Sequence, residues 1–427
     1  MPLIRPDNPR LYLESCLRLA NEVLADYGSP AEVAEAADDL NVYPGLGSLG
    51  PPESIRVLES RASQTEMGRR AVLEGRVLWE HPAAGEATRL DLGPKFFLKP
   101  ADLAASFGQS GSWAGLRPVS LGLRHVIQLV LEIQDLARES GLDPAKVMQR
   151  QTFLLIASED GIQRMSSQVA RALSSIVPLG NIWFMAQSSF PGLGRAPGGG
   201  WSFDPASPRR LHNHGHMAMQ KTMDRQIFRL DGGGRPSFMG RADFLSRLSE
   251  YWDLASANVE DLDYLSGALD LDGLGLAVRL GRSGYGMMME ISRNCRDRPI
   301  KGGMCAHDPS LGRDVVVESF RLRNVLPKDI RFLNKNMNHF LNPAKAMAEL
   351  ADKGLFMPVA VFDRWVYFQP VQGDLNFLVK TAFFTRGRAR EINSLKTQAD
   401  IPAALRAMEA QDARPGFAAL ASKAIGL

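Results

Sequence analysis

Histidines at alternate positions are the first group of residues that could carry chemistry. In the segment LHNHGHM, His212, His214 and His216 lie two positions apart. In an extended strand this spacing places the imidazoles on one face, where they could bind a metal ion. A zinc site would also need a further ligand and ordered partners around it. A polar loop therefore remains the alternative interpretation.

A glycine-rich stretch is the second group. The segment SFGQSGSWAGLRPVS contains Gly108, Gly111 and Gly115. The preceding KFFLKP is predicted to be a strand, and the following GLRHVIQLVLEIQDLARES predicts an amphipathic helix. A glycine loop in that setting binds phosphate, because its backbone N–H groups and the helix N-terminus point at the anion. A plain surface turn is the alternative.

The pattern of apolar residues predicts the elements that position these groups. Residues 1–90, including RVLWE near their end, predict a mainly helical N-terminal region. In residues 91–400, short apolar runs such as TFLLIAS and IWFMAQ alternate with amphipathic helices, which is typical of an α/β domain. Residues 401–427 predict a helical C-terminal tail. We therefore expect an α/β fold with a Rossmann-like mixed central sheet flanked by helices.

Composition narrows the classes of partner and compartment. The chain has 50 Lys and Arg against 47 Asp and Glu, so no charge excess favours nucleic acid or an anionic membrane. Cys16, Cys295 and Cys305 lack C-x-x-C spacing, which argues against a disulfide framework and favours a reducing compartment. The N-terminus lacks a signal-peptide pattern, and no apolar run approaches the ~20 residues that span a bilayer. We expect a soluble cytoplasmic protein with no nucleic-acid or membrane partner.

Several segments between about residues 100 and 400 resemble, in order, the UDP-glucose pyrophosphorylase family of UTP-dependent sugar-1-phosphate uridylyltransferases. SFGQSGSWAG is similar to the glycine loop of that family, and IWFMAQSSFPGL to the segment whose glutamine contacts uracil. ANVEDL resembles the segment with an asparagine and a metal-binding carboxylate. MEISRNCRDRPIKGG, LNKNMNHF and REINSLKTQADI are similar to three later segments. The resemblance implies a nucleotidyltransferase fold.

The resemblance also implies a role for each matching residue. The implied nucleotide-binding residues are Gly108, Gln109, Gly111, Gly115 and Gln187. The implied sugar-phosphate-binding residues are His216, Asn258, Glu290, Gly302, Gly303 and Asn336. Glu260 and its neighbour Asp261 are the implied ligands of Mg²⁺. Lys396 is the implied phosphate-contacting lysine, and Arg117 supplies the loop charge because Val119 stands where the family has a second lysine.

The implied reaction joins UTP and a sugar 1-phosphate, with glucose 1-phosphate as the default substrate and Mg²⁺ as the cofactor. A phosphate oxygen of the sugar attacks the α-phosphorus in line and expels pyrophosphate, so the protein supplies positioning and charge neutralisation. Two alternatives remain. One is a non-catalytic descendant that binds a nucleotide sugar or a protein partner, and the other is a pyrophosphorylase with a different nucleotide or sugar.

Overall fold

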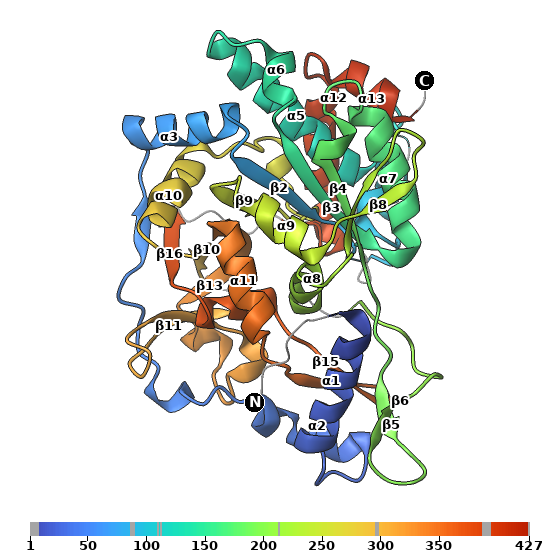
Figure 1. Cartoon of the computed structure of the whole chain (residues 1–427), viewed down its shortest axis with the longest axis vertical. Helices are drawn as coiled ribbons and strands as arrows, with labels where there is room; N and C mark the ends of the chain where they lie inside the picture. Colours follow the sequence, from blue (N-terminus) through green and yellow to red (C-terminus); the bar gives the residue numbers. More distant parts are fainter. Residues whose placement is uncertain are drawn as a thin grey trace.

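A computed structural model describes residues 8–85, 90–108, 111, 113–211, 214–294, 299–386 and 394–425, without the side chains of residues 336 and 337. The described residues form a large mixed sheet with helices on both faces and a smaller sheet below it (Figure 1). The strand order along the large sheet is β1-β16-β10-β13-β9-β2-β3-β4-β7-β8, and β11 and β12 extend it beside β13. The predicted α/β class with a mixed central sheet is confirmed.

Parallel strands form the centre of the large sheet. They are β2 (Val77–Pro82), β3 (Thr152–Ser158), β4 (Ile182–Gln187) and β9 (Asp253–Ser256). Their nearly continuous burial is that of strands covered on both faces. The strand β13 (Phe332–Leu341) runs antiparallel to β9 and connects the centre to the rest of the sheet. The remaining strands of this sheet are β1 (Arg56–Leu58), β7 (Ile227–Leu230), β8 (Pro236–Phe238), β10 (Met287–Arg293), β11 (Met304–Asp308), β12 (Arg313–Val317) and β16 (Thr381–Arg386).

Helices bury the two faces of this sheet in separate apolar clusters. Val77 and Trp79 of β2 point into one cluster, and Leu78 between them points into the other. The first cluster lies under α5 (Leu121–Glu139), α7 (Glu159–Leu173), α12 (Ile401–Asp412) and α13 (Phe417–Ile425). The second lies under α8 (His214–Lys221), α9 (Arg241–Leu248) and α11 (Pro343–Lys353). Further helices are α3 (Ala62–Leu73), α4 (Pro100–Ser106), α6 (Pro144–Met148) and α10 (Leu271–Arg282).

The smaller sheet has the order β14-β15-β5-β6 and lies at the end of the molecule that holds the first helices (Figure 1). Its members are β5 (Leu193–Arg195), β6 (Trp201–Phe203), β14 (Val359–Phe362) and β15 (Trp365–Phe368). The helices α1 (Pro9–Val23) and α2 (Pro30–Asn41) pack against it. Asn8 and Ser29 cap these helices, and in each helix a proline follows the cap as the first helical residue.

Two predictions of local structure were wrong. RVLWE is not helical but belongs to β2, between β9 and β3 in the middle of the sheet. The predicted boundary at residue 90 therefore divides residues that share one sheet. KFFLKP is not a strand, because Lys95–Phe97 form a short 3₁₀ helix and Pro100 begins α4. Short apolar runs fit a buried helix or a buried strand equally well, and the pairing partners decide.

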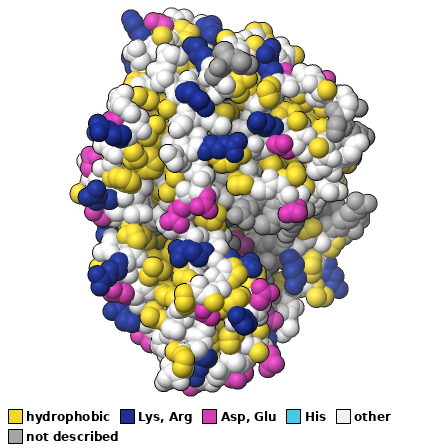
Figure 2. Space-filling model, turned by 90° about the vertical axis from the view of Figure 1, so that its right-hand side faces the viewer, with side chains coloured by type: hydrophobic (Ala, Val, Ile, Leu, Met, Phe, Trp, Pro, Cys, Tyr) yellow, Lys and Arg dark blue, Asp and Glu magenta, His cyan; other side chains and the backbone are white. Residues whose placement is uncertain are grey.

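Side chains of both charge signs are interspersed on the described surface that Figure 2 shows, which agrees with the near-balance of charges in the sequence. Within the described ranges, none of the helices has the length and apolar content needed to cross a bilayer. Cys16 and Cys305 are buried free thiols. Cys295 lies outside the described residues.

Two buried histidines predict acid sensitivity. Burial lowers the pKa of His81 to about 4 and that of His125 well below its usual range. Both folded-state pKa values lie below the unfolded value of ~6.5, so protonation of these histidines favours the unfolded state. The free energy of unfolding is therefore at its full value above pH ~6.5 and decreases as the pH falls toward 4. We expect roughly 2–3 kcal/mol of loss by pH 4.5 from His81 alone. Unfolding midpoints measured between pH 7.5 and 4.5 test this prediction. If the His81→Gln variant loses less stability than wild type over this pH range, the acid sensitivity is assigned to His81.

Candidate functional site

Adjoining cavities lie beyond the carboxyl ends of β2, β4 and β9, where open α/β sheets bind ligands. Their volumes are about 300, 170 and 200 Å³. We name them after the ligand groups that the sequence resemblance implies for their residues: the upper sugar cavity, the lower sugar cavity and the nucleotide cavity, respectively. Asn258, which follows β9, lines all of them, and Glu260 lines the lower sugar cavity and the nucleotide cavity. The structure thus brings Asn258 and Glu260, to which the resemblance gave roles in the site, to this edge of the sheet.

Two lysines meet on Glu260 where these cavities join. Lys95 Nζ forms an ion pair with Glu260 Oε2, and Lys396 Nζ lies 3.4 Å from Oε1. The backbone brings these segments together, since Leu395 N–H donates to the Glu260 carbonyl at 2.9 Å. Although burial opposes the shift, Lys95 and then Lys396 lower the pKa of Glu260. The site thus holds two ammonium groups around one carboxylate.

Small residues line one part of the nucleotide cavity. Ala83, Ala84 and Gly85 follow β2 and line this cavity together with Lys95. Gln187, the last residue of β4, is buried and also lines this cavity. A loop of small residues at the end of a central parallel strand lets a phosphate approach the backbone closely. The structure brings the predicted Gln187 together with a loop that the sequence analysis did not assign.

The upper sugar cavity is lined by hydrogen-bond acceptors. Asn338 Oδ1 and Gln372 Oε1 are buried and have no hydrogen-bond partner among the described residues. Burial raises the pKa of Glu318, which lines both sugar cavities. Unpaired buried acceptors cost free energy unless a ligand satisfies them. Hydroxyl groups of a sugar would supply the missing donors.

Gly302 and Gly303 line the lower sugar cavity. A Cβ on Gly303 would lie 3.0 Å from Glu318 Oε1. Glu290 is not among the lining residues of these cavities but lies buried in β10, where Arg386 Nε donates to it at 3.1 Å. The side chain of Asn336 lies outside the described part of the chain.

The histidine prediction selected the wrong ring. His216 is buried, its Nδ1 lies 2.5 Å from Tyr12 Oη, and its ring stacks on Phe190 at 4.3 Å. It therefore packs α8 against α1 and does not line the described cavities. His214, at the start of α8, is exposed and lines both the upper sugar cavity and the nucleotide cavity. His212 lies outside the described residues.

The predicted phosphate loop at residues 106–120 lies elsewhere. It connects α4 to α5 and does not follow a strand. Arg117 N–H donates to Asp412 Oδ2 at 2.7 Å, and its carbonyl accepts from Arg124 at 3.0 Å, so the segment packs on α12. Gly108, Gly111 and Gly115 do not line the described cavities, and Gln109 lies outside the described residues. We therefore leave Gly108, Gly111, Gly115 and Arg117 out of the site that is proposed below.

The loop after β2, which lines the nucleotide cavity, has the sequence features of a phosphate-binding loop. AAGEATRLDLGPK follows the buried run VLWEHP and contains Gly85, Gly93 and Lys95. This order, in which a strand is followed by small residues, glycines and a lysine, is the sequence pattern from which the loop could have been predicted. It was missed because RVLWE was assigned to a helix. Residues 86–89 of this loop lie outside the described part of the chain.

Arg117 offers a direct test of this correction. Its side chain is exposed and does not line the described cavities, so Arg117→Ala should leave the rate of substrate turnover within about 2-fold of wild type. Lys396→Ala should lower the rate strongly, because it removes an ammonium from the site. Initial rates of both variants check the contrast. A large loss in Arg117→Ala would restore the original assignment.

The residues do not fit a Mg²⁺ ion held by the protein. Both oxygens of Glu260 already face ammonium groups, and Asp261 Oδ1 accepts from the backbone of Asp263 at 3.0 Å. In the described ranges, no group of three or more His, Cys, Asp or Glu side chains is arranged to hold a metal. A Mg²⁺ ion prefers several oxygen ligands and binds through substrate phosphates in many nucleotide sites.

Comparison with known proteins gives a match at the level of structure. No protein-family model and no curated protein matches the sequence. A UDP-N-acetylglucosamine pyrophosphorylase from Trypanosoma brucei, solved with an inhibitor, is 15% identical, with a TM-score of 0.61 over 93% of this chain and 84% of that chain. A putative UDP-N-acetylglucosamine pyrophosphorylase from Entamoeba histolytica is 14% identical, with a TM-score of 0.55 over 81% and 83%. A UDP-glucose pyrophosphorylase variant from Leishmania major is 14% identical, with a TM-score of 0.54 over 90% and 78%.

The chain has the fold of the UDP-sugar pyrophosphorylases. The predicted resemblance is thus confirmed at the level of the fold. Within this pyrophosphorylase fold, the lysine pair lies beyond the ends of the central strands, between the nucleotide cavity and the lower sugar cavity.

Proposed function

We propose that the protein is a UTP–sugar-1-phosphate uridylyltransferase, which forms a UDP-sugar and pyrophosphate. The observation that carries the proposal is the meeting of Lys95 and Lys396 on Glu260, where the nucleotide cavity and the lower sugar cavity join. The fold of UDP-sugar pyrophosphorylases supports it. Glucose 1-phosphate is the default sugar substrate, as the sequence resemblance implies.

The chemistry follows from the arrangement of charges. An oxygen of the sugar phosphate forms a bond to the α-phosphorus of UTP, and the bond from that phosphorus to the β-phosphate oxygen breaks. Negative charge accumulates on the α-phosphoryl oxygens, and two preorganised ammonium groups stabilise it. Glu260 fixes the separation of Lys95 and Lys396, so little reorganisation is needed at the moment of reaction. We assign Gln187 to a hydrogen bond with the base, and Glu318 and Asn338 to hydrogen bonds with the sugar.

We further propose that Mg²⁺ enters with the triphosphate and is not held by Glu260 or Asp261. When bound to the nucleotide, it neutralises part of the phosphate charge. Its role is thus separate from that of the lysine pair.

Pyrophosphate release from a panel of nucleoside triphosphates and sugar 1-phosphates tests the proposal. We expect turnover with UTP and glucose 1-phosphate or N-acetylglucosamine 1-phosphate. Binding of a UDP-sugar without turnover of any pair would instead favour the non-catalytic descendant. Turnover only with another base or sugar would favour a pyrophosphorylase of altered specificity.

A further inference from the structure

The upper sugar cavity has no lysine or arginine among its described lining residues. The ionisable residues that line it are Glu318 and His214. The surrounding protein desolvates His214 and lowers its pKa, so this ring is neutral at pH 7. In the described part of the chain, Glu318 is therefore the one lining group of this cavity that can carry a charge at pH 7.

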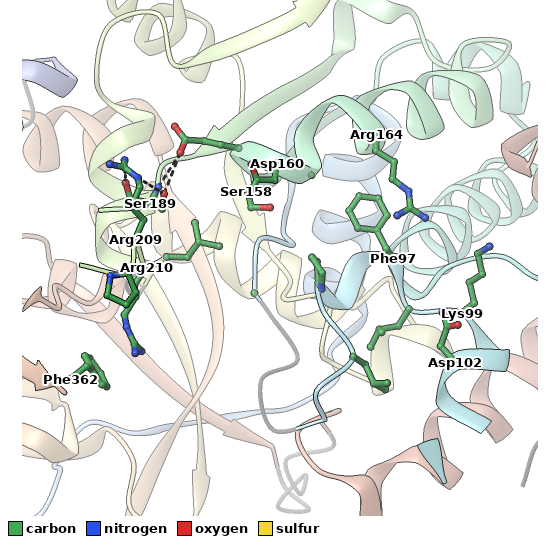
Figure 3. Close-up of a pocket in the computed structure, with 18 of the residues that line it drawn as sticks. Phe97, Lys99, Asp102, Ser158, Asp160, Arg164, Ser189, Arg209, Arg210 and Phe362 are labelled. Carbon is green, nitrogen blue, oxygen red and sulfur yellow. Dashed lines mark hydrogen bonds between the residues drawn. The ribbon is translucent and has the colours of Figure 1, made fainter. Parts of the chain in front are cut away.

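Several basic side chains of this part of the molecule line a larger cleft of about 1310 Å³ (Figure 3). Lys99 and Arg164 lie on one wall of this cleft, and Arg209 and Arg210 lie on the other. None of these four residues lines the upper sugar cavity. Their positive charge therefore does not neutralise Glu318 by direct contact.

The Glu318 side chain forms no hydrogen bond or ion pair among the described residues. The nearest compensating charge is that of Arg321, which opposes the rise that burial causes in the pKa of Glu318. Arg321 Nη1 already lies 3.4 Å from Oδ2 of the buried Asp374. Burial raises the pKa of Asp374 to about 7. Two carboxyl groups thus share one guanidinium, and positive charge is in deficit beside the cavity.

Further acceptors line the same cavity. Asn338 Oδ1 and Gln372 Oε1 are buried and lack hydrogen-bond partners in the described ranges. Glycines lie beside the Glu318 carboxylate, because a Cβ on Gly303 or Gly373 would lie 3.0 or 3.7 Å from its Oε1. The absence of a side chain at both positions leaves this oxygen open to a ligand. The cavity thus offers one carboxylate and two amide oxygens to a group that donates several hydrogen bonds.

We infer that the upper sugar cavity binds the ammonium group of an amino sugar, so that an unacetylated amino-sugar 1-phosphate is used in preference to glucose 1-phosphate. The choice of a sugar 1-phosphate rests on the proposed function. An ammonium supplies three N–H donors and a positive charge, whereas a hydroxyl supplies one donor and no charge. Lys335 and Lys396 line the lower sugar cavity, and their charge suits the phosphate of the same molecule. The amino group takes no part in bond formation, so Glu318 acts here on specificity.

Binding of sugar 1-phosphates to the full chain tests the inference without turnover. The amine of glucosamine resembles an α-amino group, with a pKa of ~7.7–8.0, so it is mainly an ammonium at pH 7. We expect glucosamine 1-phosphate to bind roughly 10-fold more tightly than glucose 1-phosphate, because hydrogen bonds between charged groups are the stronger ones. N-acetylglucosamine 1-phosphate, in which acetylation removes the charge, should lose this advantage. Equal affinities for glucosamine 1-phosphate and glucose 1-phosphate would overturn the inference.

Variants of Glu318 assign the preference to its charge. Glu318→Gln keeps the size of the side chain and removes the charge, so it should bring the two affinities within about 2-fold of each other. Glu318→Asp keeps the charge on a shorter side chain and should keep part of the preference. Glu409→Gln is the matched control, because Glu409 is an exposed residue of α12 that does not line the described cavities, and it should keep the full preference. A full preference in Glu318→Gln would contradict the inference.

Pyrophosphate release with UTP separates a failure of this inference from a failure of the proposed function. If glucose 1-phosphate is turned over at least as efficiently as glucosamine 1-phosphate, the uridylyltransferase stands and the amino-sugar preference is wrong. If the protein binds glucosamine 1-phosphate through Glu318 but releases no pyrophosphate with any nucleoside triphosphate, the proposed function fails and the ammonium site stands.

Discussion

Replacing Lys95 by alanine is expected to lower kcat/KM for UDP-sugar formation about 100- to 1000-fold, the loss typical when one preorganised donor to a developing charge is removed. Lys95 contacts Glu260 with only 14% of its side chain exposed, so its ammonium is held in place before substrate binds. The variant also leaves Glu260 with Lys396 alone, which removes the fixed separation of the two cations.

Steady-state rates over a range of UTP and sugar 1-phosphate concentrations measure this effect. Lys345→Ala, an exposed lysine on α11, is the matched control and should keep the wild-type rate. Lys95→Arg keeps the charge but changes the geometry, so it should recover only part of the rate. A wild-type rate in Lys95→Ala, with an unchanged unfolding midpoint, would show that the loop after β2 does not bind the reacting phosphate.

Lys221→Met is expected to cost about 3–5 kcal/mol of stability, which makes it the most destabilising single change considered. Lys221 of α8 and Glu80 of β2 form an ion pair, and both side chains are fully buried. Ser256 Oγ also donates to Glu80 at 2.8 Å. Removing the lysine leaves a charged carboxylate in the centre of the protein whose remaining side-chain hydrogen bond among the described residues is the one from Ser256, and the folded state must neutralise it or lose stability.

Urea unfolding of three variants isolates the cause. Glu80→Leu combined with Lys221→Met should recover most of the loss, because a buried ion pair and a matched apolar pair are often similar in stability. The methionine would lie near Phe340, which Lys221 Nζ approaches to 5.5 Å from the ring centroid. If the double variant were as unstable as Lys221→Met, a packing defect and not the unpaired charge would explain the loss.

Part of the site was predictable because its residues follow strands that are evident in the sequence. TFLLIAS and IWFMAQ are continuous apolar runs, and the structure confirms them as β3 and β4. The ordered matches along the chain selected Gln187 and Asn258, and in the structure Gln187 ends β4 and Asn258 follows β9 at the carboxyl edge of the sheet. Lys396 was placed by a similar match and reaches the same edge through Glu260.

The wrong site predictions concern alternatives between which the local sequence cannot decide. The alternating His212, His214 and His216 could present any of their rings to a ligand, and a contact between His216 and Tyr12, more than two hundred residues away, decided in favour of His214. The glycines near residue 110 satisfied a loop pattern, yet the segment binds α12 through Asp412.

By itself, the sequence determined the α/β class, the mixed sheet flanked by helices, and several polar residues at strand ends, because burial and turns leave periodic patterns within a few residues. Only the tertiary structure decided that VLWEHP is a central strand and that Lys95 therefore meets Lys396 on Glu260. The physical reason is that a short apolar run is stable as a strand only when its backbone groups find partners. For β2 those partners are β3 and β9, about 75 and 175 residues further along the chain.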